Sequence, residues 1–240
     1  MHWQTIDRAL TGDGSELTLS LLGDRYAMRV DGQELMNSAS HGSEEKLAVF
    51  GCAGLARKPG ARILIGGLGM GFTARAALGA VASDAEVVVV ECVAAVVRWN
   101  REILGHLAGA PLADPRVSVV DGDVVDAIAK TARRYDAILL DVDNGPSALS
   151  SFKNRRLYSE GGLRKARRAL RPGGVLAVWS TFQDASFTAR MRAVGFAPTI
   201  KRVLAGDGTR RRHVLIIARG AATGPRVPRI SSKKPARRRQ

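Results

Sequence analysis

The chain of 240 residues predicts an α/β protein built on a doubly wound parallel sheet. From residue 61 to residue 180, patterns typical of buried strands alternate with patterns typical of helices. A glycine-rich run, Gly67–Gly71, joins the first of these strands to a helix, as in the turns on which such sheets bind nucleosides. Near the C-terminus, two further strand patterns flank Gly206-Asp207-Gly208 and indicate an antiparallel hairpin.

Residues 1–42 precede this alternation and predict a small N-terminal β-hairpin region. Leu17–Leu22 and Arg25–Val30 alternate between apolar and polar residues around the turn sequence Gly23-Asp24, which indicates two antiparallel strands. A polar loop, Asn37–Gly42, follows. A helix is then expected to begin near Ser43.

Ser43 is the expected N-cap of this helix. Glu44 and Glu45 would lie in its first turn, where acidic side chains interact favourably with the helix dipole. The main α/β domain is predicted over residues 43–222.

Within this domain, strands are predicted at 62–66, 86–91, 116–120, 136–141 and 174–180. Helices are predicted near 71–82, 93–108, 123–133, 159–171 and 184–194. Pro172-Gly173-Gly174 would stop the fourth helix before its strand. The final hairpin pairs Ala197–Leu204 with His213–Ala218. A parallel sheet that ends in an antiparallel hairpin is typical of the class I AdoMet-dependent transferase fold, which is therefore the predicted fold.

The net charge of +15 is concentrated in part at the C-terminus. Residues 225–240 contain seven Lys or Arg and no acid, and the segment 223–240 is too polar and proline-rich to form a core. We predict a disordered basic tail. It is suited to contact nucleic acid or another anionic surface, and a merely solvated tail is an equal alternative.

The sequence also predicts where in the cell the protein is located. The sequence has no stretch long enough to span a bilayer, and its first ten residues lack the apolar region of a signal peptide. Cys52 and Cys92 are isolated, with neither metal-binding nor redox spacing, so both are expected to be buried apolar side chains in a protein of the reducing cytoplasm. No metal site is predicted.

The glycine loop is the first candidate site. Gly67, Gly69 and Gly71 keep side chains away from the backbone, so that a ligand could approach it closely. Glycine loops also serve ordinary turns. The run Gly69–Ala74 additionally satisfies the G-x-G-x-x-A variant of the dinucleotide motif, so neighbouring residues must decide the ligand.

Three acids stand at or just after predicted strand ends, and in a doubly wound sheet these ends share one edge. Glu91 is suited to accept hydrogen bonds from both ribose hydroxyls, and Asp123 from an adenine amino group. Asp141 would lie beside the reacting centre. Each acid could instead be a helix cap, Asp123 above all.

The segment Tyr135–Pro146 is the second candidate site. A buried strand ends in two carboxylates, Asp141 and Asp143, and a turn follows. Acids clustered at a strand end could hold a cationic amine, accept its proton and complement a sulfonium charge. An acidic turn cap is the alternative.

Histidine and tryptophan residues are weaker candidates. Trp99 and Trp179 are expected in the core, and His213 is expected to be structural or exposed. His41 precedes the first helix and is more consistent with a surface loop than with an acceptor pocket.

Over residues 25–180 the chain resembles the spermidine synthase (polyamine aminopropyltransferase) family. The resemblance is carried by the segments Asp31–Met36, Ser43–Lys46, Ile65–Gly71, Glu91, Asp123-Val124, Tyr135–Pro146 and Leu157–Leu163. It implies a small N-terminal β domain and a class I AdoMet-type domain. The implied reaction moves an aminopropyl group from decarboxylated AdoMet to a small-molecule amine, as in polyamine biosynthesis.

The resemblance also implies roles for individual residues. Glu91 would bind ribose, Asp123-Val124 would bind adenine, and Asp141, with Asp143 nearby, would hold and deprotonate the amine. A homodimer is suggested by the same analogy. The aspartate that the family carries in its glycine loop, opposite the amine of the donor, is Gly69 here.

Three alternatives stay open. An ordinary AdoMet-dependent methyltransferase is compatible with Gly69, although the acid that such enzymes place before the glycine loop is Ile65 here. RNA methylation is a variant that could use the basic tail. A non-catalytic nucleoside-binding protein is opposed by Asp141 and Asp143, and NAD-dependent reduction is opposed by the final hairpin and Asp123.

Overall fold

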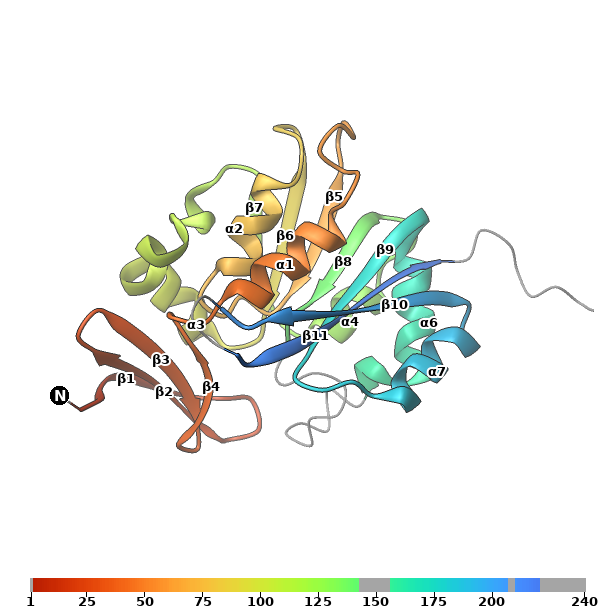
Figure 1. Cartoon of the computed structure of the whole chain (residues 1–240). Coiled ribbons are helices and arrows are strands. Elements are labelled where there is room, and N and C mark those ends of the chain that lie inside the picture. The colour runs from red at the N-terminus through yellow and green to blue at the C-terminus, as the bar shows by residue number, and fades with distance from the viewer. Residues whose placement is uncertain (1, 143–155, 207–209, 221–240) are drawn as a thin grey trace, which may run out of the picture.

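The computed structural model describes residues 2–142, 156–206 and 210–220 (Figure 1). In these ranges the chain forms two sheets, a four-stranded sheet at the N-terminus and a seven-stranded sheet flanked by helices. The predicted tail at 223–240 and Asp143 lie outside the described residues.

The N-terminal sheet is antiparallel and follows chain order: β1 (Gln4–Leu10), β2 (Glu16–Leu22), β3 (Arg25–Val30) and β4 (Gln33–Asn37). The predicted hairpin is confirmed as β2 and β3. The prediction was wrong in stopping at two strands. No residue of the outer strands β1 and β4 is fully buried, so neither needs the apolar alternation by which a strand is recognised in sequence.

The large sheet has the order β10-β11-β9-β8-β5-β6-β7. Its strands are β5 (Arg62–Gly66), β6 (Glu86–Glu91), β7 (Val117–Asp121), β8 (Tyr135–Leu140), β9 (Leu170–Ser180), β10 (Phe196–Leu204) and β11 (Arg212–Gly220). The five strands from β5 to β9 are parallel, and β11 pairs antiparallel with both β9 and β10. The predicted doubly wound sheet with an antiparallel C-terminal hairpin is confirmed.

The strand order reverses between β5 and β8. From β5 the chain builds outward through β6 to β7, then returns to place β8 on the other side of β5. The connections that follow β5 and β8 therefore leave neighbouring strand ends in opposite directions. Such a switch point at the carboxyl ends of the strands is where doubly wound sheets bind ligands.

Helices cover both faces of the sheet (Figure 1). They are α1 (Gly42–Gly51), α2 (Phe72–Gly79), α3 (Ala94–Trp99), α4 (Val124–Ala129), α6 (Glu160–Ala169) and α7 (Ala185–Ala193). Ile63 and Ile65 of β5 belong to one apolar cluster, and Leu64 between them belongs to another. Because alternate residues of a strand point to opposite faces, β5 is buried on both sides, as parallel strands usually are.

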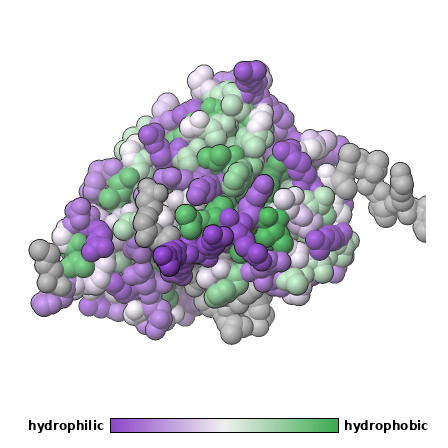
Figure 2. All heavy atoms as spheres, viewed as in Figure 1, coloured by the Kyte–Doolittle hydropathy of each residue, from purple (hydrophilic) through white to green (hydrophobic). Residues whose placement is uncertain are grey.

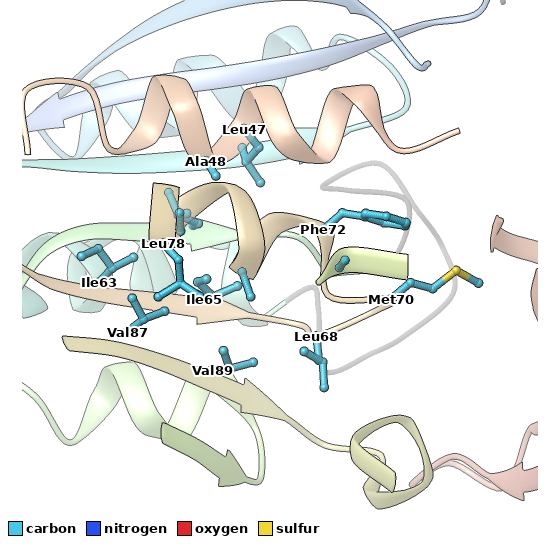
Figure 3. Packing of buried hydrophobic residues seen from close by; sticks show 14 of the residues in the cluster. Leu47, Ala48, Ile63, Ile65, Leu68, Met70, Phe72, Leu78, Val87 and Val89 are labelled. Carbon is cyan, nitrogen blue, oxygen red and sulfur yellow. The ribbon is translucent and has the colours of Figure 1, made fainter. Parts of the chain in front are cut away.

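The first cluster packs α1 and α2 against the sheet. In Figure 3, Leu47 and Ala48 of α1 lie above α2, whose Leu78 lies above Ile63 and Ile65 of β5. Leu19 and Met28 of the N-terminal sheet belong to the same cluster, which also contains the fully buried Trp99. One continuous core therefore connects the small sheet to the helices around the glycine loop.

The predicted helix 93–108 is not a single α-helix. After α3 the backbone widens into a π-helical turn, Asn100–Leu104, and then tightens into a 3₁₀ turn, Gly105–Ala108. Asn100 explains the irregularity, because its side-chain Nδ2 donates to the carbonyl oxygens of Val96 at 2.9 Å and Gly69 at 2.7 Å. Such π turns often mark functional sites.

The start of β9 also differs from prediction. Helix α6 ends at Ala169 and β9 begins at Leu170, so Pro172-Gly173-Gly174 lie within the strand rather than between helix and strand. The pairing of β9 with β8 shifts register between Tyr135 and Ala137. This irregularity accommodates a proline that a regular central strand would exclude.

Asp136 of β8 is a buried charge with several partners. Its carboxylate accepts hydrogen bonds from Lys58 Nζ at 2.6 Å, the Arg62 backbone N–H at 2.8 Å and Arg171 Nη1 at 2.7 Å. Burial by itself would raise the pKa of Asp136, but these partners hold it below its ordinary value. The carboxylate thus ties β8 to both neighbouring strands.

Hydrophilic residues cover much of the face shown in Figure 2, with hydrophobic areas between them. No helix in the described part of the chain is both long and apolar enough to cross a membrane. Trp99 and Trp179 are buried, as predicted. Cys52 is also buried, but the prediction for Cys92 was wrong: it follows β6 directly and is exposed.

Candidate functional site

The glycine loop between β5 and α2 depends on glycine for its own conformation. Gly67, Gly69 and Gly71 have φ values of 87°, 52° and 86°, in the left-handed region that favours glycine. A Cβ atom at Gly67 would lie 2.3 Å from the carbonyl oxygen of Asp141. At Gly69 it would lie 2.7 Å from Cε of Met36. The loop is therefore closely packed on two sides.

Glu91 ends β6, as predicted, and lies against this loop. Its Oε2 accepts the backbone N–H of Leu68 at 2.9 Å, and its Oε1 accepts that of Val93 at 2.9 Å. A carboxylate oxygen can accept a second hydrogen bond. The two backbone donors thus hold the carboxylate at the start of the loop. Each carboxylate oxygen can still accept one more hydrogen bond, for example from a ligand.

Asp141 follows β8 on the other side of the loop. Its backbone N–H donates to Gly66 O at 3.0 Å, and its Oδ2 accepts the hydroxyl of Thr73 at 2.6 Å. Burial raises the pKa of Asp141 to about 6, and the Thr73 hydrogen bond opposes that shift. A carboxylate of this basicity can exchange protons near neutral pH.

Glu44, in the first turn of α1, is a further acid near this loop, and it is buried. Its side chain is 7% exposed, and its Oε2 accepts the hydroxyl of Ser43 at 2.5 Å. Burial, and next the negative charge of Asp141, raise the pKa of Glu44 to about 7. The sequence placed Glu44 only in a helix first turn, and nothing in the local pattern distinguishes it from the exposed Glu45.

Ser43 is not the N-cap that the sequence predicted. The helix begins at Gly42, and His41 at the cap position makes no side-chain capping bond. Ser43 is instead buried, and its Oγ accepts Trp179 Nε1 at 3.0 Å and lies 2.9 Å from His213 Nδ1. When Glu44 is ionised, the one proton of the Ser43 hydroxyl goes to its carboxylate, and Nδ1 of His213 is then the donor of the remaining bond.

His213 itself is buried rather than exposed. Burial, and next the charge of Arg211, lower the pKa of His213 to about 4, so the imidazole is neutral at physiological pH. Its Nε2 has no hydrogen-bond partner among the described residues. His213 and Trp179 come from β11 and β9, far in sequence from Ser43, so the sequence alone could not reveal this cluster.

The remaining predicted residues have local structural roles. Asp123 caps α4, its Oδ1 accepting the backbone N–H of Val125 at 2.7 Å. The side chain of Val124 packs in the second apolar cluster. His41 stacks on Phe72 with ring centroids 4.0 Å apart.

The structure thus brings Glu91 and Asp141 to opposite sides of one glycine loop, and adds Glu44, Thr73 and Asn100, which the sequence analysis did not identify as site residues. Asp123 follows β7, at the edge of the sheet beyond β6. Thr73 lies within the G-x-G-x-x-A run, and this position in the motif is the one feature of the sequence that could have identified it as a site residue.

Comparison with known proteins decides the family. Residues 45–190, more than half of the chain, match the family model described as the spermine/spermidine synthase domain. The chain belongs to the spermine/spermidine synthase family. The resemblance inferred from the glycine loop and the strand-end acids is confirmed. A comparison with curated proteins finds no significant match.

Solved spermidine synthases share the fold of this family member. The Thermotoga maritima enzyme superposes with a TM-score of 0.72 and 16% sequence identity, over 92% of this chain and 73% of that chain. A spermidine synthase in complex with the transition state analogue AdoDATO superposes with a TM-score of 0.70 and 16% sequence identity, also over 92% of this chain and 73% of that chain. A probable spermidine synthase from Corynebacterium glutamicum superposes with a TM-score of 0.63 and 20% sequence identity, over 93% of this chain and 81% of that chain.

Glu44 is expected to make this synthase-family protein less stable as the pH rises toward neutrality. The Glu44 carboxyl has a pKa of 4.5 when unperturbed and about 7 in the fold, so between these values the folded chain binds the extra proton. The contribution is complete below the lower pKa and is lost through the upper one, about 3 kcal/mol in all. Glu44→Gln should remove the part of the fall in stability that comes from Glu44.

Urea unfolding of both proteins from about pH 5 to about pH 8 measures the difference. The comparison with the variant is needed because two other groups titrate in both proteins. Asp141, with its raised pKa, lowers stability in the same direction as Glu44, and His213, with its lowered pKa, changes stability in the opposite direction below its unperturbed value of 6.5. Parallel pH profiles for the two proteins would contradict the expectation.

Proposed function

We propose that the protein is an aminopropyltransferase that uses decarboxylated AdoMet as donor and a small amine as acceptor. The observation that carries the proposal is Asp141, a partly buried carboxylate of raised pKa at the switch point of the sheet, in a chain of the spermine/spermidine synthase family. The complex of a similarly folded spermidine synthase with AdoDATO supports the choice of donor.

Residues of the loop and the strand ends would hold the nucleoside. Glu91 would accept the two ribose hydroxyls on the lone pairs that its backbone donors leave. The second oxygen of Asp123 would accept the adenine amino group, since Oδ1 is used by Val125. Gly67, Gly69 and Gly71 would let the ligand approach the backbone, and Val124, whose side chain is buried, would contribute through its main chain.

The reaction requires a neutral amine in line with the bond to be broken. Asp141 would hold the amine and orient it toward the carbon next to the donor's sulfonium. A carbon–nitrogen bond forms as the carbon–sulfur bond breaks, and the electron pair of the latter moves to sulfur, which leaves as the neutral thioether methylthioadenosine. Asp141 accepts the proton that the amine nitrogen loses. Asp143 stays a proposed second acid.

Methyl transfer from AdoMet is the second candidate, and one observation favours it. Where the family's loop aspartate would face the donor's amine, this chain has Gly69, and the space beside it is filled by the thioether of Met36. No carboxylate from the loop would then repel the carboxylate of intact AdoMet. The acceptor, a homodimer, a cytoplasmic location and nucleic-acid binding by the tail stay predictions.

Titration calorimetry distinguishes the candidates. Aminopropyl transfer predicts tight binding of methylthioadenosine and decarboxylated AdoMet, with little binding of AdoMet or NAD. Glu91→Gln should weaken methylthioadenosine binding about 10- to 100-fold, because a charged acceptor is lost. Glu86→Gln, at the other end of β6 and paired with Arg62, is the matched control and should bind normally. Preference for AdoMet and its demethylated product would favour methyl transfer instead.

A further inference from the structure

We propose that the protein binds single-stranded nucleic acid on a surface of its own, formed where β9 and β10 end and β11 begins. We call it the Phe182 surface, and its residues are Phe182, Arg202, Leu204, Arg210 and Arg212. The ring of Phe182 would stack on a base, and the arginines would contact phosphates. The inference does not depend on the proposed function, because it uses no residue assigned to the donor or to the amine.

The net positive charge of the chain comes from its last third. Residues 161–240 contain 20 Lys or Arg and two acids, whereas residues 1–160 contain 17 Lys or Arg and 20 acids. Such an asymmetry between parts of one chain favours a polyanionic partner. The predicted tail is one source of this charge. The folded strands are another, since the described residues after Asp184 include no acid.

Strand register brings the Phe182 surface together at one end of the sheet. The strands that carry it, β9, β11 and β10, lie side by side (Figure 1). Ser180, the last residue of β9, pairs with Val214, which also pairs with Arg202. Because β11 is antiparallel to β9, Phe182 and Arg212 each lie two residues beyond this row in the same direction.

The two strand arginines share one face of the sheet. Arg202 lies opposite Val214, and Arg212 is two residues from Val214 on the same strand, so all three side chains point to the same side. Val214 itself belongs to the second apolar cluster. The arginines therefore form the exposed end of a face whose inner part is core.

Hydrogen bonds hold the segment after β9 against this face. Arg202 Nη2 donates to Gln183 Oε1 at 2.8 Å. Ser180 Oγ donates to the main-chain oxygen of Phe182 at 2.7 Å and accepts its backbone N–H at 3.3 Å. The backbone at Phe182 is thus held in place, while its side chain remains 66% exposed. A ring presented in this way loses little conformational entropy when a base stacks on it.

The arginines of this surface are not neutralised by the protein. Among the described residues, no acid forms an ion pair with Arg202, Arg210 or Arg212. The nearest acid along β9 and its loop, Asp184, caps α7 instead. Arg8, which is also exposed, has Glu16 as its partner. The unpaired guanidinium groups can therefore neutralise the charge of a ligand.

The combination of groups favours a single strand of nucleic acid over other polyanions. Arginines bind phosphates and an aromatic ring stacks on a base, and a strand outside a duplex offers both at once. The apolar part of the surface is limited to Phe182 and the 44% exposed Leu204. Two such side chains cover far less than the roughly 800 Å² per partner of a typical protein interface. They also do not form the long apolar face that holds a helix in a membrane surface.

Fluorescence anisotropy tests the inference on the full chain, with a labelled single-stranded oligouridylate of about 12 nucleotides as the probe. Uridine is chosen because it contains no adenine that could enter the nucleoside site. Phe182→Ala should weaken binding about 5- to 100-fold, because one stacked base is lost. Its effect should vanish with an abasic strand of the same length, which keeps the phosphates.

The arginines are tested by the salt dependence of the same binding. Arg202→Gln combined with Arg212→Gln should weaken binding and reduce the slope of log K against log salt by about 1.4, for two phosphate contacts to a single strand. Trp3→Ala and Arg8→Gln are the matched controls. They alter an exposed ring and an exposed arginine at the N-terminal end of the chain, and both should bind like the wild type.

Several results would overturn the inference. One is wild-type affinity in both the Phe182 and the double-arginine variants, which would assign the binding to the tail alone. Others are an equal effect of Phe182→Ala on the abasic strand, or no binding of the oligouridylate by the wild type. Binding to vesicles of phosphatidylserine and phosphatidylcholine without binding to the oligonucleotide would point to a membrane surface instead.

Discussion

Asp141→Asn is expected to lower the rate of aminopropyl transfer by about a thousandfold or more, because the site loses its proton acceptor. Asparagine keeps the size of the side chain and can still accept the hydroxyl of Thr73. The affinity for methylthioadenosine should change by only about a few-fold, since the nucleoside is assigned to other residues. Single-turnover kinetics with decarboxylated AdoMet, together with calorimetry, measure the two quantities separately.

Asp126→Asn provides the matched control for this prediction. Asp126 lies exposed in the first turn of α4 and should tolerate the same exchange without a change in rate. Turnover by Asp141→Asn at the wild-type rate would remove Asp141 from the catalytic role. A loss of nucleoside affinity as large as the loss of rate would instead assign it to binding.

Gly67→Ala is expected to lower the free energy of unfolding by about 3 kcal/mol or more. Two effects combine at this position. The φ of 87° is strained for alanine, and the new Cβ would meet the Asp141 carbonyl oxygen at 2.3 Å. The clash is with backbone on a neighbouring strand end, which cannot rotate away. The variant should therefore also displace Asp141 and lose activity beyond its loss of stability.

Two other glycines separate these effects in the same urea unfolding assay. Gly54→Ala shares the positive φ, at 90°, but its Cβ would meet no atom within 4 Å, so it reports strain alone at about 1–2 kcal/mol. Gly79→Ala, at the end of α2, has neither problem and should be neutral or stabilising by up to about 1 kcal/mol. Equal losses at Gly67 and Gly54 would show that contact with Asp141 is unimportant.

Local patterns were sufficient for the main elements of the fold. Apolar runs and the glycine loop located β5, α2 and β6, and their alternation implied the parallel sheet. The patterns failed where the local sequence carries little information. Strands β1 and β4 lack alternation because none of their residues is fully buried. The helix that begins at Ala94 widens because Asn100 donates to a carbonyl of the distant glycine loop.

Some residues of the candidate site could likewise be predicted from local patterns, and others could not. Glu91 and Asp141 could be found because each ends or follows a buried strand, and parallel strands present their carboxyl ends at one edge. Glu44 could not be found, since helical periodicity does not tell it apart from Glu45. Its burial depends on where α1 packs, and that is decided by contacts with β9 and β11.

The amino-acid sequence alone determined a doubly wound sheet, a glycine loop, and two acids at the ends of the strands on either side of β5, because these follow from residue spacing along single elements. Tertiary structure alone decided which acids lie buried together and which have a cation nearby. Those properties depend on packing between segments far apart in the chain. Asp136 meets Lys58 and Arg171, whereas Glu44 meets Ser43 and, through Thr73, Asp141.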